Sequence, residues 1–316
     1  MADKSGGAES EATRFAFVAV LGAPNVGKST LINRLVGTKV SIVSPKVQTT
    51  RARVLGICIA GPAQIVFIDT PGVFEPRRRL DRAMVAAAWT GAADADRVCL
   101  LVDAERGIDR DTHAIVKRLV KQRKSADLVL NKSDLVKKPA LLELADRLNN
   151  EGQFGDIFMI SAERGDGVDD LLAHLAAGAP EGPWMFPEDQ ISDMPERLLA
   201  AEITREKLYL QLRQELPYAA TVETETWTEM DDGSARIEQV IYVQRGTQKA
   251  IVLGKKGARI KSIGADSRLE LEELLDRRVH LFLFVKVREK WGDDPERYRD
   301  WGLDYNAGGG ICCPSI

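Results

Sequence analysis

The residues with the clearest chemistry form a short glycine-rich run near the N-terminus. The run reads Gly22, Ala23, Pro24, Asn25, Val26, Gly27, Lys28 and Ser29. It follows an apolar stretch at 15–21 and opens a helix-like stretch at 28–35, so it matches the pattern G-x-x-x-x-G-K-[ST] in the required context. Its backbone N–H groups can surround phosphates, Lys28 can bridge two phosphate oxygens, and Ser29 can ligate Mg²⁺. The run, extended by Thr30, predicts a phosphate-binding nucleotide loop.

A second motif, acidic at its first position, lies further along the chain. Asp69, Thr70, Pro71 and Gly72 follow an apolar stretch at 64–68. A carboxylate at this place can hold Mg²⁺ through a water molecule, and the N–H of Gly72 can contact a γ-phosphate. Alone, D-x-x-G is more often a simple turn. Behind a phosphate loop it predicts the second half of a metal site.

A third motif has residues that could recognise the base of a bound nucleotide. Asn131, Lys132, Ser133 and Asp134 end an apolar stretch at 128–130. The Asp134 carboxylate can accept hydrogen bonds from guanine N1–H and the exocyclic amine, a donor pair that adenine lacks. Lys132 would cover the base and Asn131 would tie the loop together. The motif therefore favours GTP over ATP.

A fourth motif could also contact the guanine base. Ser161, Ala162 and Glu163 follow the next apolar stretch and are typical of the fifth GTPase motif, whose backbone supports the guanine carbonyl.

The segment before Asp69 contains two adjacent threonines, Thr49 and Thr50. In GTPases one threonine of this segment reaches the metal when triphosphate is bound, so the segment acts as a switch. The spacing leaves both registers open. By analogy with related GTPases we expect Thr50 to be the Mg²⁺ ligand, with Lys28, Gly72 and both threonines in the switching machinery.

The chain lacks the glutamine that orients the attacking water in Ras-like enzymes, because Val73 stands at that position. We therefore expect slow intrinsic hydrolysis. Asn25 is the residue type that ligates K⁺ in related GTPases without this glutamine, so K⁺ is a candidate cofactor beside GTP, GDP and Mg²⁺.

The elements that must position these motifs alternate between short apolar and helical stretches from 15 to 179. The predicted strands are 15–21, 53–59, 64–69, 97–102, 127–131 and 157–161, and the predicted helices are 28–35, 82–90, 112–121, 140–149 and 168–177. This alternation predicts a doubly wound α/β sheet, with ligands at the carboxyl ends of the strands. We expect a disordered leader at 1–14 and a proline-rich linker at 180–195.

The C-terminal half predicts a different, α+β domain. A helix at 196–214 precedes strands at 219–228 and 235–243, a helix–loop–helix segment at 248–275 and a strand at 279–287. This α-β-β-α-α-β order is that of a type II KH fold, placed at 196–292, with a C-terminal tail at 293–316.

A G-x-x-G loop, Gly254 to Gly257, lies between the two helices of that segment. In KH domains this loop clamps the backbone of about four single-stranded nucleotides. From 244 to 261 the chain has basic residues and no acidic one; the basic residues are Arg245, Lys249, Lys255, Lys256, Arg259 and Lys261. The loop and these side chains predict an RNA-binding surface.

Composition limits the alternatives. The 316-residue chain is 44% hydrophobic and 29% charged, with a net charge of -3, so any contact with nucleic acid must come from a local basic patch. No apolar run reaches the ~18–20 residues that cross a bilayer. Four cysteines give no disulfide framework, and we expect a cytoplasmic protein.

In combination, these motifs resemble the Era family of bacterial GTPases. The resemblance rests on 22–29, 48–51, 69–72, 131–134, 161–163 and 254–257, with further matching stretches at 187–189, 203–208, 215–218 and 285–287. It covers about 15–302, while the leader and 304–316 match nothing in the family.

The resemblance implies a monomeric ribosome-assembly factor. Members bind the 3′ end of 16S ribosomal RNA through the KH domain, associate with the maturing small (30S) subunit, and favour RNA in the GTP form. Some are found as peripheral proteins at the inner face of the cell membrane. A GTPase partner in tRNA modification would carry a different architecture, and a purely structural nucleotide site would not need Lys28, Ser29, Asp69 and Asp134 intact.

Overall fold

The computed structural model describes residues 12–46, 49–212 and 217–308. Most of the predicted leader, Gln48, Glu215, Leu216 and the last eight residues lie outside these ranges.

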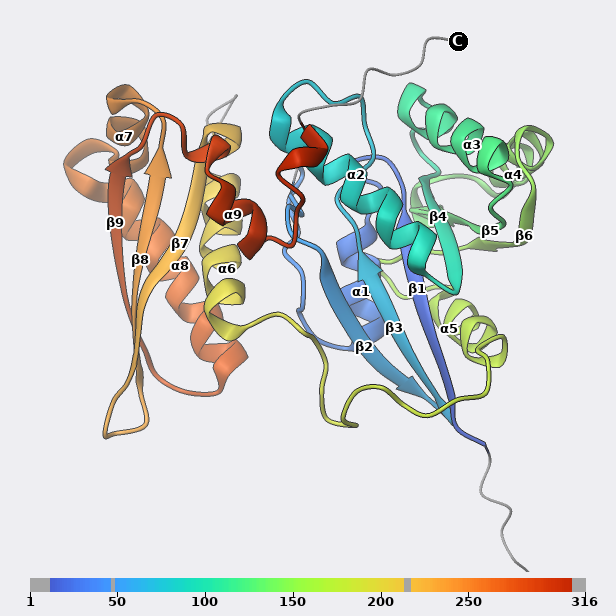
Figure 1. The fold of residues 1–316 in the computed structure, drawn as a ribbon, viewed down its shortest axis with the longest axis horizontal. Helices are drawn as coiled ribbons and strands as arrows, with labels where there is room; N and C mark the ends of the chain where they lie inside the picture. Colours follow the sequence, from blue (N-terminus) through green and yellow to red (C-terminus); the bar gives the residue numbers. More distant parts are fainter. Residues whose placement is uncertain (1–11, 47–48, 213–216, 309–316) are drawn as a thin grey trace, which may run out of the picture.

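The N-terminal domain is built on a six-stranded sheet (Figure 1). Its strands are β1 (Arg14–Leu21), β2 (Val54–Ala60), β3 (Ala63–Asp69), β4 (Arg97–Asp103), β5 (Ala126–Asn131) and β6 (Phe154–Met159). They stand in the order β2-β3-β1-β4-β5-β6, and only the β2–β3 pair is antiparallel. The strand ends that carry the sequence motifs therefore meet at one edge of the sheet.

Helices cover both faces of this sheet. They are α1 (Lys28–Val36), α2 (Arg79–Asp94), α3 (Arg110–Gln122), α4 (Lys138–Glu151) and α5 (Val168–Ala177). The helices α2, α3 and α4 share one apolar cluster with alternate strand residues, and α1 and α5 share another with the residues between them. Strands covered on both faces read as continuous apolar runs, as the sequence shows. The predicted doubly wound α/β fold is confirmed.

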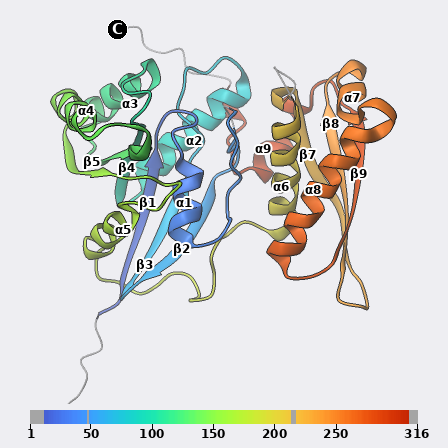
Figure 2. The ribbon, with the colours of Figure 1, turned by 180° about the vertical axis from the view of Figure 1, so that it is seen from behind.

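The second domain packs helices on one face of a three-stranded sheet. It contains α6 (Glu196–Gln211), β7 (Ala220–Glu229), β8 (Ala235–Val243), α7 (Gly246–Leu253), α8 (Ala258–Leu275) and β9 (Val279–Val287). β8 pairs antiparallel with β7 and parallel with β9. The helices α6 and α8 lie side by side against the sheet (Figure 2). This is the predicted α-β-β-α-α-β order.

The segment predicted as a linker lies along the first domain. The Ile57 N–H donates to Ile191 O at 2.9 Å, and Gly56 bridges to Ser192. Because β2 is an edge strand, its free backbone groups are available for this pairing. At the other end of the domain, β1 begins at Arg14, inside the predicted leader, since Arg14 pairs with Ala63.

The described part of the predicted tail is folded. A short helix, α9 (Pro295–Asp300), lies between α6 and α2 (Figure 1). The side chains of Tyr298, Trp301 and Leu303 are buried against Met84 of α2. The apolar area removed from water explains why this segment does not extend into solvent as a tail.

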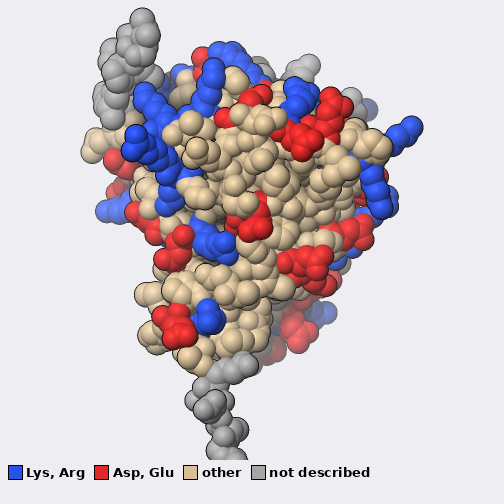
Figure 3. All heavy atoms as spheres, turned by 90° about the vertical axis from the view of Figure 1, so that its right-hand side faces the viewer, with Lys and Arg blue, Asp and Glu red and all other residues tan. Residues whose placement is uncertain are grey.

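At the end of the molecule seen in Figure 3, groups of Lys and Arg and groups of Asp and Glu both lie among uncharged side chains, in keeping with the small net charge. Among the helices of the described ranges, none has the length and apolar composition needed to cross a bilayer.

Candidate functional site

The predicted phosphate loop connects the end of β1 to the start of α1. Its Lys28 side chain is buried and donates to the carbonyls of Gly22 and Ala23, at 3.1 and 3.0 Å. Gly27 has φ +98°, and a Cβ there would lie 2.3 Å from the Asn131 amide nitrogen. A Cβ on Gly72 would lie 3.0 Å from Pro24. Glycine at both positions lets neighbouring motifs approach the loop closely.

The buried ammonium of Lys28 is sensitive to pH. Burial lowers the pKa of Lys28 to about 8, and the negative charge of Asp69 opposes the shift. Bound phosphates would stabilise the charged form, so binding above this pKa requires uptake of a proton.

We therefore expect affinity for a non-hydrolysable GTP analogue to fall as pH rises through about 8. The bound state holds more protons, and between pH 7 and 9 the loss should be about tenfold. Titration with a fluorescent GTP analogue at pH 7 and at pH 9 measures this change in affinity. Lys28→Met should bind more weakly at both values and without this dependence. A flat profile for the unaltered protein would contradict the account.

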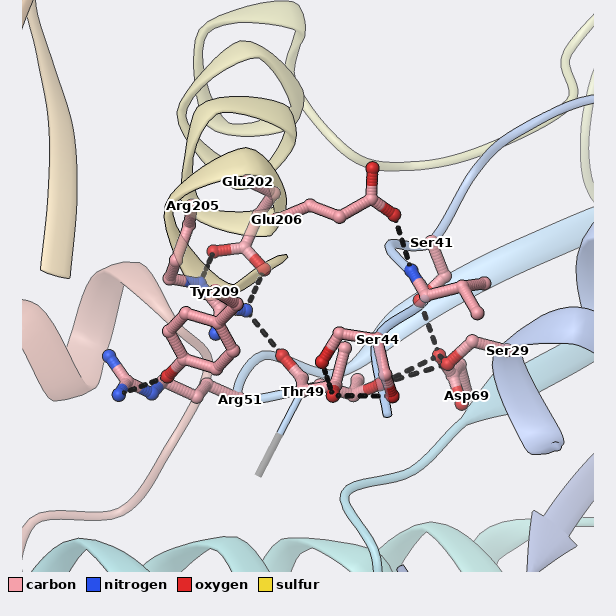
Figure 4. Close-up of polar contacts among 12 residues, drawn as sticks. Ser29, Ser41, Ser44, Thr49, Arg51, Asp69, Glu202, Arg205, Glu206 and Tyr209 are labelled. Atoms are coloured by element: carbon pink, nitrogen blue, oxygen red, sulfur yellow. Dashed lines mark hydrogen bonds and ion pairs between the residues drawn. The ribbon is translucent and has the colours of Figure 1, made fainter. Parts of the chain in front are cut away.

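The three predicted Mg²⁺ ligands meet at the end of β3. Oδ2 of Asp69 accepts from Ser29 Oγ at 2.9 Å, Ser41 Oγ at 2.5 Å and Thr50 Oγ1 at 3.3 Å. Ser29 Oγ and Thr50 Oγ1 are 3.0 Å apart. Figure 4 shows Ser29 and Ser41 converging on Asp69.

The other oxygen of this carboxylate is left without a partner. Oδ1 of Asp69 is buried and forms no hydrogen bond with any described residue. Burial raises the pKa of Asp69, and the hydrogen bonds from Ser41, Ser29 and Thr50, with the charge of Lys28, oppose the rise. An unpaired buried carboxylate oxygen beside two hydroxyls is a donor set of the kind that hard divalent cations prefer. The cluster therefore fits Mg²⁺.

The two candidate threonines point to different partners. Thr50 is buried and faces Ser29 and Asp69. Thr49 Oγ1 lies 2.7 Å from Ser44 Oγ and donates to Lys46 O at 2.6 Å. Only Thr50 reaches the cluster in this arrangement.

The guanine motif ties three loops together. The Asn131 side chain donates to Val26 O at 2.8 Å and accepts from the Ala162 N–H at 2.9 Å. It thus links the phosphate loop to the fifth motif, the role that the sequence predicts. Lys132 has φ +64° and donates to Asp103 Oδ2 at 2.6 Å.

The other residues predicted to recognise the base are Asp134 and Ser161. Asp134 Oδ2 is 3.3 Å from Arg164 Nε. Ser161 is fully buried, and its hydroxyl accepts from the Arg164 N–H. β6 ends at Met159, before the predicted 161, since Ser161 already turns to bond Asp166.

A cavity of about 410 Å³ lies over these loops. The predicted residues in its lining are Pro24, Asn25, Gly27, Lys28, Ser29, Thr30, Thr49, Thr50, Gly72 and Lys132. Asp69, Asn131, Asp134 and Ser161 lie outside that lining, while Ala162 and Glu163 line an adjacent hollow with Thr30.

Among the residues of this site that sequence reasoning missed are Ser41 and Arg106. Ser41 donates to Asp69, and Arg106 lines the cavity and donates to Pro24 O at 3.2 Å. Neither belongs to a motif that could have identified it.

The position of the missing glutamine is occupied by a core residue. Val73 is buried in the apolar cluster under α2, and its N–H donates to Gly22 O at 3.1 Å. It has no polar group that could orient water. Asn25 has φ +64°, and its amide donates to Pro45 O at 2.9 Å, so it faces the loop that carries the threonines.

The G-x-x-G loop projects between α7 and α8. Gly254 and Gly257 have φ +70° and +77°, a region that favours glycine. Lys255 and Lys256 between them are exposed. Arg259 is partly used internally, because its guanidinium donates to Ile251 O.

The six basic residues around this loop are not paired with carboxylates of the described residues. Within the described ranges, Arg245, Lys249, Lys255, Lys256, Arg259 and Lys261 form no ion pair. The local positive patch that the sequence predicts is therefore not neutralised by neighbouring carboxylates.

Comparison with known proteins identifies both domains. The sequence model described as a 50S ribosome-binding GTPase matches 17–132, and the KH domain model matches 215–292. GTPase Era of Rhizobium meliloti (strain 1021) is 62% identical over 293 residues, which are 93% of this chain and 94% of that protein.

Two solved structures match across both domains. A variant of Aquifex aeolicus Era bound to GDP and AlF4⁻ has a TM-score of 0.87 at 41% identity, covering 92% of this chain and 99% of that one. Era in complex with MgGDPNP and nucleotides 1506–1542 of 16S ribosomal RNA has a TM-score of 0.86 at the same identity and coverage. The chain belongs to the Era family of GTPases, enzymes that hydrolyse GTP.

Proposed function

We propose that this GTPase is a nucleotide-controlled RNA-binding factor that acts on the 3′ end of 16S ribosomal RNA during assembly and maturation of the 30S subunit. The observation that carries the proposal is one chain joining a guanine-nucleotide site to an unneutralised basic G-x-x-G loop. The relative solved with 16S RNA shares 41% identity over 92% of this chain, which supports the same ligand class here.

The contacts of the site residues support the following roles. Ser29, Thr50 and the carboxylate of Asp69 would hold Mg²⁺, which supplies positive charge opposite the phosphates when bound. Lys28 and the loop amides would bind the phosphates, and Gly72 would meet the γ-phosphate.

The base would be held on the other side of the site. Asp134 would read the guanine edge and Lys132 would cover its face. Asn131, which bonds Ala162, would keep the supporting backbone of Ser161 to Glu163 in place.

Hydrolysis should be slow and assisted by K⁺. The Val73 side chain supplies no polar group, whereas the Asn25 amide, whose NH2 donates to Pro45 O, also carries an oxygen that would suit a monovalent cation. Replacing K⁺ with Na⁺ at constant ionic strength should lower the hydrolysis rate several-fold, by loss of transition-state charge stabilisation. An unchanged rate in Na⁺ would contradict this role, and Asn25→Ala should abolish any preference between the two ions.

Localisation and oligomeric state stay predictions of the family resemblance: a cytoplasmic monomer, with part of the population peripherally attached to the inner face of the membrane.

Binding to an oligonucleotide with the 16S 3′-end sequence tests the RNA assignment. With GTP analogue present, the protein should bind this RNA at least tenfold more tightly than a permuted sequence of equal composition. The comparison separates base reading from phosphate contacts, which permutation does not change. Equal affinity for the two RNAs would contradict a specific target.

A further inference from the structure

The helix that begins the KH domain holds the threonine loop of the GTPase domain. We call residues 43–46 and 49–51 the switch loop. Glu206 Oε1 accepts from the Val43 N–H at 2.7 Å, and the Arg205 guanidinium donates to Thr49 O. Figure 4 shows both side chains reaching from α6 to this loop. One helix therefore bonds the backbone of the switch loop near its beginning and near its end.

A third contact runs from the loop into the KH domain. Arg51 follows Thr50 directly and is 1% exposed. Its guanidinium donates to the Tyr209 hydroxyl at 2.7 Å and to Ala220 O at 3.1 Å, and it lies 5.2 Å from the Trp291 ring centroid. Burying a charged guanidinium group costs free energy unless partners such as these replace its lost hydration. Since consecutive Cα atoms are about 3.8 Å apart, Thr50 cannot travel far while Arg51 is anchored.

The spacing of the α6 residues explains how one helix makes these contacts. Glu202, Arg205, Glu206 and Tyr209 are separated by three, one and three positions, so they share one face of the helix. Glu202 binds the Arg205 guanidinium through Nε at 2.8 Å, which orients it toward the loop. Arg205 and Glu206 of this face lie in 203–208, a stretch outside the nucleotide motifs and outside the G-x-x-G loop.

We propose that this face of α6 positions the switch loop for GTP hydrolysis, with Glu206 and Tyr209 as positioning residues acting through Val43 and Arg51. The proposal rests on the proposed role of Thr50 at the metal. In this arrangement Thr50 lies against Ser29 and Asp69 while α6 bonds both sides of it, so the KH domain completes the GTPase site. By linkage, closing the loop favours this placement of α6.

Four variants test the proposal by single-turnover hydrolysis and nucleotide binding. Glu206→Ala removes the acceptor for Val43, and Tyr209→Phe removes only the hydroxyl that accepts from Arg51. Glu206→Gln keeps an acceptor oxygen but loses the charge. Glu270→Gln is the matched control, because Glu270 binds the same Lys39 and Lys207 as Glu206 but no backbone group of the described switch loop.

We expect about tenfold slower hydrolysis for Glu206→Ala and Tyr209→Phe, and near-normal rates for Glu206→Gln and Glu270→Gln. Affinity for a GTP analogue should fall in the first pair, while affinity for GDP should not, since only triphosphate closes the switch. Normal hydrolysis rates in both Glu206→Ala and Tyr209→Phe would overturn the proposal. It would also be overturned if GDP affinity fell as much as GTP-analogue affinity in these two variants, or if Glu270→Gln slowed hydrolysis as much as they do.

Thr50→Ala separates this proposal from the one on which it rests. A normal rate in Thr50→Ala would refute the metal assignment and with it the route through Thr50. A slow Thr50→Ala beside normal Glu206→Ala and Tyr209→Phe would refute the positioning role alone.

Discussion

Replacing Asp134 with asparagine should lower affinity for GTP by about a hundredfold and raise affinity for XTP. The carboxylate would accept two hydrogen bonds from guanine, and charge-assisted bonds of this kind contribute about 1.5–3 kcal/mol each. The amide of asparagine accepts one and turns a donor toward the guanine amine. Xanthine carries a carbonyl in place of that amine, so the same amide would suit it. Competition against a fluorescent GDP measures both affinities.

Arg164 provides the control for this substitution. Its Nε is 3.3 Å from Asp134, but its side chain is largely exposed, so their ion pair contributes little. Arg164→Ala should therefore change GTP affinity by less than about threefold. Unchanged GTP affinity in Asp134→Asn would show that another group reads the base.

Introducing aspartate at Gly254 and Gly257 should reduce RNA affinity at least a hundredfold and leave nucleotide affinity unchanged. Each carboxylate would stand among basic side chains where phosphates are expected, so attraction becomes repulsion. Fluorescence anisotropy with labelled 16S 3′-end RNA measures the loss, and GDP binding serves as the internal reference.

The two glycines differ in what they tolerate. A Cβ on Gly254 would lie 2.8 Å from the Arg259 Cβ, whereas one on Gly257 meets nothing within 4 Å. The single change Gly257→Asp therefore tests charge with little steric disturbance, because aspartate accepts the left-handed region better than most residues. Gly257→Asn is its neutral match and should lose far less affinity. Full RNA binding by the double variant would exclude this loop as the clamp.

Much of this site could be predicted because each nucleotide motif is contiguous in sequence and lies at a strand end. Backbone geometry then brings Lys28, Asp69 and Asn131 together without further information. The type II KH order was predictable for a similar reason, since helical and strand periodicities alternate clearly. Spacing alone left Thr49 and Thr50 open and only analogy favoured Thr50, because adjacent residues of a loop point in different directions.

Contacts between the domains could not be predicted. Glu206 accepts from the Val43 N–H across 163 positions of the chain, and neither residue belongs to a nucleotide motif or to the G-x-x-G loop. The sequence analysis assigned 293–316 only to a C-terminal tail, and the packing of Tyr298 and Trp301 with α2 has no signal in the mostly polar stretch around them. Such contacts depend on how two folded domains pack together, and the hydrophobic periodicity of the sequence carries no information about that packing.

The most direct test of the account measures affinity for the 16S 3′-end RNA in three states: with GTP analogue, with GDP and without nucleotide. The account predicts binding at least tenfold tighter with the analogue than with GDP, because closure of the switch loop and the position of α6 are linked. Equal affinity in all three states would contradict control of the RNA-binding domain by the nucleotide.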